Sequence, residues 1–118
     1  MADVTVKHID ELESYEGKGR FLFARRGLEI TSFGVNVQRW PAGYADYPDH
    51  DHTKDGQEEV YFVVDGSVTL DTSEGPFELV PGTFARVGPG VRRKLLPGAD
   101  GVTLISLGGQ PGTFGEAA

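Results

Sequence analysis

Near the middle of the chain, metal-ligating side chains are close together in the run Tyr47-Pro-Asp-His50-Asp-His52-Thr-Lys-Asp-Gly-Gln-Glu58-Glu59. If His50 and His52 lie on extended backbone, their side chains point to one face, because strand side chains alternate. Two imidazoles on one face can bind the same ion, and Glu59 could supply a third ligand where the next strand begins. Two histidines and one carboxylate suit a divalent transition metal such as Fe, Mn, Zn or Ni. The same run could instead be a solvated acidic loop.

Turn signals divide the surrounding sequence into short segments. From Asp65-Gly66 onward, Gly and Pro pairs leave no room for a helix of ordinary length, which is typical of an all-β sandwich or barrel. The Asp65-Gly66 pair predicts a two-residue hairpin. A single helical turn is expected near Ile9 to Leu12. We expect about eight strands, at Phe21–Arg25, Leu28–Trp40, Val60–Val64, Ser67–Thr72, Phe77–Val80, Thr83–Val87, Val91–Leu96 and Val102–Leu107.

The run from Gly43 to Gly66 resembles the first motif of the cupin superfamily, G-x5-H-x-H-x3-4-E-x6-G, with a longer loop before Glu59. The second motif, G-x5-P-x-G-x2-H-x3-N, is matched in spacing from Gly82 through Gly88-Pro89-Gly90 to Arg93. The resemblance is to small single-domain, cupin-2-like proteins. It implies a single cupin-type β-barrel, or double-stranded jelly roll, with the site in its mouth. We expect one domain over 1–118, with the barrel core at about 20–107, an N-terminal segment 1–19 and a loose tail 108–118.

Arg93 stands where the resemblance implies a fourth, histidine ligand, and His8 is too far along the chain to replace it. A guanidinium stays protonated, so it cannot coordinate a cation. Three arrangements remain open. Arg93 could point away from a three-ligand metal, contact an acidic or oxygenated ligand at the metal's open side, or take the ion's place and pair with Glu59. Tyr61 shares the face of Glu59, and we expect Tyr61 and Arg93 to be ligand-binding residues.

These residues predict a small-molecule-binding protein with a divalent metal held by His50, His52 and Glu59. The alternative is a metal-free anion-binding module, or a structural or dimerisation unit without catalysis. The resemblance allows dioxygenase, isomerase or epimerase chemistry, and nothing in the chain chooses among them or decides whether the protein is an enzyme.

Composition excludes several other function classes. The net charge of −7 argues against nucleic-acid binding, which usually needs a basic face. The chain has no cysteine, so thiolate metal sites and disulfides are excluded. Neither a membrane-spanning apolar run nor a nucleotide-binding motif is present, so we expect a cytoplasmic protein without a nucleotide cofactor. Val60, Phe62 and Val64 share a second apolar strand face that needs a cover, either another sheet or a partner subunit. Dimers are frequent among cupins, so the resemblance implies a homodimer.

Overall fold

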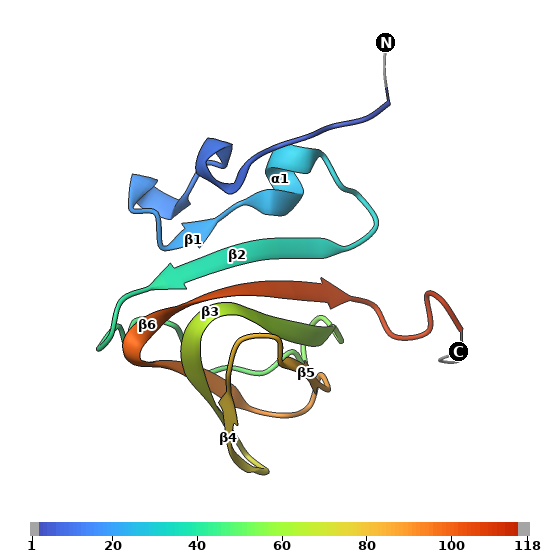
Figure 1. Ribbon diagram of the computed structural model, residues 1–118. Coiled ribbons are helices and arrows are strands. Elements are labelled where there is room, and N and C mark those ends of the chain that lie inside the picture. The colour runs from blue at the N-terminus through green and yellow to red at the C-terminus, as the bar shows by residue number, and fades with distance from the viewer. Residues whose placement is uncertain (1–2, 116–118) are drawn as a thin grey trace.

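The computed structural model describes residues 3–115 as a sheet of β-strands preceded by short helical turns (Figure 1). Residues 116–118 of the expected tail lie outside this range. Among the described residues, no helix is long and apolar enough to cross a membrane. The elements in chain order are the 3-10 turns η1 (Ile9–Glu11) and η2 (Tyr15–Gly17), β1 (Phe21–Leu22), α1 (Ala24–Leu28), β2 (Gly34–Trp40), β3 (Glu58–Thr72), β4 (Gly75–Leu79), β5 (Phe84–Val87) and β6 (Arg93–Gly109).

The strands form one antiparallel sheet in the order β1-β2-β6-β3-β4, and β5 also pairs with β3. β3 and β6 are long and bent, and they pair from Glu58↔Gly109 at one end to Thr72↔Arg93 at the other. Their curvature wraps the sheet around the core, as Figure 1 shows. This architecture confirms the all-β barrel that the sequence predicts.

The predicted hairpin at Asp65-Gly66 is wrong. The two segments that it was expected to join are halves of β3, and both pair with β6 rather than with each other. Register shifts between Val63 and Asp65 and between Gly66 and Val68 bend the strand at this point. A glycine with positive φ serves a bulge as readily as a turn, so the dipeptide alone does not separate the two. The expected strands Val91–Leu96 and Val102–Leu107 are likewise parts of the single strand β6.

The first two predicted strands are also shorter than expected. β1 ends at Leu22, and Ala24–Leu28 forms the helix α1 in place of strand residues. Ala, Arg and Leu have high helix propensity, which explains why this segment forms a short helix. β2 begins only at Gly34, whereas Leu28 was its expected start. The one-turn helix near Ile9 is confirmed by η1, and β6 extends to Gly109, so the start of the expected tail is ordered as strand.

Alternating side chains along the strands build the barrel core. Tyr61 and Val63 of β3 and Leu104 of β6 are completely buried inside the barrel, and Trp40 at the end of β2 packs with them. The opposite face of β2 carries Val37, which α1 and the N-terminal segment cover. The barrel interior and this second cluster hold β2, β3 and β6 in fixed positions, which makes them a rigid support for a site.

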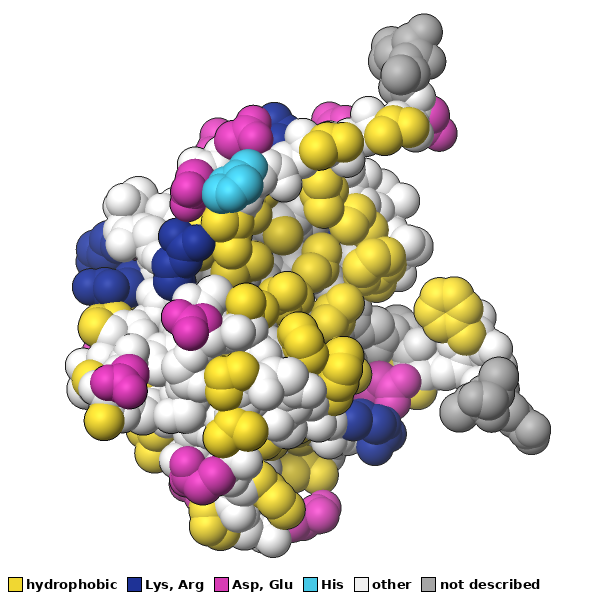
Figure 2. All heavy atoms as spheres, in the orientation of Figure 1, with side chains coloured by type: hydrophobic (Ala, Val, Ile, Leu, Met, Phe, Trp, Pro, Cys, Tyr) yellow, Lys and Arg dark blue, Asp and Glu magenta, His cyan; other side chains and the backbone are white. Residues whose placement is uncertain are grey.

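Part of the outer sheet face stays uncovered. Phe62 of β3 stacks on Phe84 of β5 with ring centroids 4.3 Å apart, and Phe84 is still 70% exposed. Val64 on the same strand is also exposed. Figure 2 shows hydrophobic side chains gathered across the face that it presents. The homodimer expected from this apolar face stays a prediction.

The bend in β3 gives a test of this architecture. Gly66 has φ +73°, and a Cβ there would lie 2.1 Å from the Gly101 carbonyl oxygen of β6. Gly66→Ala is therefore expected to lower the free energy of unfolding by about 2–3 kcal/mol, from the left-handed backbone and the clash together. Gly82→Ala is the matched control, since Gly82 has φ +85° with open space around its Cβ position. It should cost only about 1 kcal/mol in urea unfolding, and equal losses for the two variants would contradict the close approach of β3 to β6.

Candidate metal centre at the barrel mouth

A loop between β2 and β3 carries His50 and His52. Backbone hydrogen bonds attach this loop to the first residue of β6 and to the segment before β6. His50 and Arg93 exchange both backbone hydrogen bonds, with N···O distances of 3.0 and 2.7 Å. The His52 amide donates to the Pro89 carbonyl at 2.9 Å. The expectation of extended backbone is met at His50, which forms an isolated antiparallel bridge with Arg93. Directly paired residues point to one face, so the side chains of His50 and Arg93 lie together.

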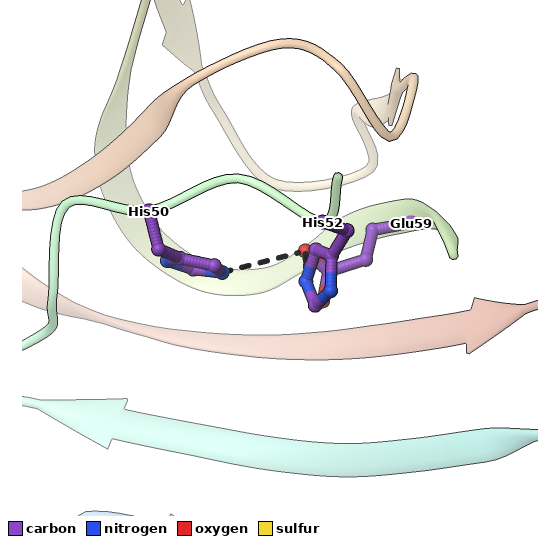
Figure 3. Close-up of side chains that lie close together, drawn as sticks. All are labelled: His50, His52 and Glu59. Atoms are coloured by element: carbon purple, nitrogen blue, oxygen red, sulfur yellow. Dashed lines mark hydrogen bonds and ion pairs between the residues drawn. The ribbon is translucent and has the colours of Figure 1, made fainter. Parts of the chain in front are cut away.

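The structure brings His50, His52 and Glu59 into one group, with one ligand atom from each within 4.8 Å of the others. Glu59 comes from the start of β3, and both imidazoles turn toward its carboxylate, as Figure 3 shows. The Nε2 atoms of His52 and His50 lie 3.1 and 3.9 Å from Glu59 Oε1. The three predicted ligands therefore converge, and the group could hold a metal ion.

Both imidazoles are oriented through their other ring nitrogen. His50 Nδ1 donates to the Pro48 carbonyl at 2.9 Å, and His52 Nδ1 lies 3.0 Å from the Asp55 carboxylate. A carbonyl or carboxylate on Nδ1 fixes the proton there and leaves Nε2 as the free ligand atom. This is the usual support of a metal-binding histidine.

His52 lies between two carboxylates, and this has a chemical consequence. Asp55 faces Nδ1, and Glu59 Oε1 faces Nε2 at 3.1 Å. Ionised carboxylates only accept hydrogen bonds. A neutral imidazole has one proton, so it cannot donate to both. A cation between Nε2 and Oε1 would satisfy the contact to which the ring does not donate.

The similarity to solved structures identifies the fold. A cupin protein from Bacteroides fragilis matches with a TM-score of 0.80 and 18% identity, over 100% of this chain and 93% of that one. This chain has the cupin fold. A sugar phosphate isomerase of the cupin superfamily from Silicibacter pomeroyi matches with a TM-score of 0.65 and 22% identity, over 76% of this chain and 58% of that one. KdgF from Halomonas sp. matches with a TM-score of 0.59 and 14% identity, over 67% and 69% of the two chains.

No protein-family model matches this chain, and no curated protein matches it either. The cupin resemblance read from the two sequence motifs is thus confirmed by the fold.

Arg93 is the main departure of this chain from the ligand set that the sequence motifs predict. Its side chain is completely buried, and Nη1 donates to Glu59 Oε1 at 2.6 Å. Nη2 donates to the Gly88 and Val91 carbonyls at 2.6 and 2.9 Å, and Nε donates to the Val91 carbonyl at 3.0 Å. Of the three arrangements left open by the sequence, the structure shows the pairing of Arg93 with Glu59. The guanidinium is therefore a buried positive charge in direct contact with the Glu59 carboxylate.

Tyr61 completes the hydrogen bonds of Glu59. Its hydroxyl donates to Oε1 at 2.7 Å, and its side chain is completely buried. Burial and then nearby negative charge raise the pKa of Tyr61, and burial followed by the charge of Glu59 raises the pKa of Tyr47 to about 12. Both hydroxyls are therefore protonated at neutral pH, so Tyr61 is a permanent donor to Glu59.

Exposure decides which side chains a visiting molecule meets. The side chains of His50, His52 and Glu59 are 25%, 18% and 13% exposed, and that of Arg93 is 0% exposed. A visiting molecule therefore meets the two imidazoles and the Glu59 carboxylate, whereas Arg93 and Tyr61 are buried. Direct ligand contacts by Arg93 and Tyr61 stay predictions, and in this structure both act on the site through Glu59.

Sequence reasoning missed two parts of the site. Asp55 and the Pro48 carbonyl orient the imidazoles, although both belong to a loop whose acidic residues are expected to be solvated. The spacing of Asp55, three residues after His52, was the available signal. His8, the third histidine, lies apart and caps η1 by accepting from the Asp10 amide at 3.1 Å.

The donor set agrees with a divalent transition metal. Two Nε2 atoms and a carboxylate oxygen are suitable ligands, and each imidazole has its outer partner in place. The opposing feature is Arg93, because Glu59 Oε1 already accepts from its guanidinium. Among residues 3–115, the side chains that hydrogen-bond to the Glu59 carboxylate do so at Oε1, so Oε2 is the oxygen left to bind a metal.

Proposed function

We propose that this protein is a small-molecule-binding cupin that holds a divalent transition metal through Nε2 of His50, Nε2 of His52 and the Glu59 carboxylate. The observation that carries the proposal is the orientation of the two imidazoles. Each has Nδ1 occupied by a fixed acceptor and Nε2 turned toward Glu59. At His52 this leaves Nε2 facing a carboxylate, a contact that a bound cation would satisfy without a second ring proton.

Arg93 has a positioning role in this proposal. It fixes the orientation of the Glu59 carboxylate through a hydrogen bond of 2.6 Å from its charged guanidinium. Because an arginine stands where a fourth ligand is expected, a bound metal keeps open positions for an oxygenated molecule. When bound, such a metal supplies Lewis-acid polarisation of an oxygen atom. The two imidazole edges and the Glu59 side chain border the approach to that position.

The fold supports a small-molecule role without naming the molecule. The Silicibacter pomeroyi protein of the same fold is a sugar phosphate isomerase. Many reactions occur on one fold, so this name assigns neither a ligand nor a reaction to this chain.

A second candidate function rests on the Arg93–Glu59 contact of 2.6 Å. The guanidinium already supplies a positive charge to Glu59, so the site is electrically satisfied by the protein alone. The two imidazoles would then bind an anionic or oxygenated ligand directly. This candidate predicts no stoichiometric metal.

Metal content separates the two candidates. Protein purified without chelator should contain close to one transition metal ion per chain by inductively coupled plasma mass spectrometry. His52→Ala should lower the affinity for Zn²⁺ or Mn²⁺ by more than about 100-fold, because the site then keeps only two ligands. His8→Ala is the matched control and should retain full loading, since His8 is remote from the site. If wild type, His52→Ala and His8→Ala all contained the same substoichiometric amount of metal, the metal proposal would be overturned and the metal-free candidate favoured.

A further inference from the structure

A cavity lies beside the candidate metal centre, and His50 belongs to both. Its volume is about 350 Å³, within the range of small-ligand pockets. The chain has seven Phe, four Tyr and one Trp, twelve aromatic residues in all, and six of these line this cavity. The six come from η2, β1, the residue after β1, the end of β2 and the following loop: Tyr15, Phe21, Phe23, Trp40, Tyr44 and Tyr47.

The rings on one side of the cavity form a continuous aromatic wall. Trp40 stacks on Tyr44 with centroids 5.2 Å apart and an interplanar angle of 15°. Tyr47 packs against Trp40 at 5.0 Å and 44°, and its ring meets His50 edge-on at 5.3 Å. Tyr47 thus connects the aromatic wall to the candidate metal centre.

Charge favours one kind of occupant. Asp46, which is exposed, is the acidic residue that lines the cavity, and no Lys or Arg of the described residues lines it. The faces of aromatic rings carry negative potential and attract cations such as quaternary ammonium groups. The net charge of −7 acts in the same direction. A purely apolar ligand would gain nothing from Asp46.

We propose that this aromatic cavity binds an organic cation of the quaternary ammonium type, held against the rings of Tyr44 and Tyr47, which pack on the buried Trp40, with Asp46 at the rim. The proposal names the ligand class of the cavity next to His50, and it rests on the proposed function only in that one small molecule reaches both. An oxygenated end of the ligand would lie at the imidazoles, and the cationic end would lie against the rings.

The probe for this cavity is choline, compared with its neutral isostere 3,3-dimethyl-1-butanol. Trp40 is the single tryptophan and lines the cavity, so its fluorescence reports binding. Choline is expected to bind at least about tenfold more tightly than the isostere, because only the cation interacts with the ring faces and the carboxylate. Equal binding of the two probes, or binding of neither, would overturn the proposal.

Variants assign the effect to the cavity. Asp46→Asn should weaken choline binding several-fold and leave the isostere unchanged, and its exposed position makes a folding defect unimportant. Tyr44→Leu should weaken choline more than the isostere. Phe84→Leu, an exposed aromatic on β5 away from this cavity, is the control that should change neither.

The titrations are run with chelator and again with added Zn²⁺. If choline binds in chelator, and wild type purified without chelator contains no more metal than His52→Ala, the proposed metal function fails and the cation cavity stands. If metal loads fully and choline does not bind, the reverse holds.

Discussion

Arg93→Met is expected to lower the free energy of unfolding of the metal-free protein by about 3–4 kcal/mol, because removing one partner leaves a charge buried without compensation. Arg93 is completely buried and donates to Glu59, Gly88 and Val91. Glu59, at 13% exposed, would keep the Tyr61 hydroxyl as a donor. The measurement is urea unfolding in chelator, so that metal loading does not contribute.

Arg86→Met is the matched control for this prediction. Arg86 pairs with Glu58 at 2.9 Å, but its side chain is 65% exposed, so its loss should cost less than about 0.5 kcal/mol. Glu59→Gln added to Arg93→Met should recover part of the loss, because the unpaired charge is then removed. If Arg93→Met were as mild as Arg86→Met, the buried pair would not stabilise the barrel mouth.

Arg93→His is expected to raise the affinity for Zn²⁺ at least about 100-fold. The substitution removes a positive charge close to the ligands, where like charges repel by several kcal/mol, about 4 kcal/mol at 4 Å and an effective dielectric constant of 20. It also restores an imidazole at the place where the cupin motif has its fourth ligand. Competition with a chromophoric chelator gives the affinity.

Arg93→Gln separates the two causes. It removes the charge without adding a good ligand, so its gain should be smaller than that of Arg93→His. An Arg93→His protein that binds Zn²⁺ no more tightly than wild type would show that the guanidinium neither competes with the metal nor occupies a ligand position.

The general architecture was predictable from local patterns. Gly and Pro spacing indicates strands, and the apolar run Val60–Val64 indicates a central strand, although the outer face of this strand at Val64 stays exposed. What failed was the assignment of breaks. Asp65-Gly66 and Pro97-Gly98 lie inside β3 and β6, because pairing between these two long strands continues through the bends. A local turn signal carries no information about a pairing partner that is distant in the sequence, such as Val102 opposite Gly66.

The sequence by itself determined the ligand types His50, His52 and Glu59, the approximate positions of the strands that carry them, and the presence of an arginine where a histidine is expected. Only the tertiary structure decided what that arginine does. The direction of the Arg93 side chain depends on its backbone pairing with His50 and on carbonyls at Gly88 and Val91, which alternation along β6 does not encode. The structure alone also brings together Asp55 behind His52 and the aromatic cavity beside His50, because these contacts join a loop, η2, β1 and β2 that are separate in the sequence.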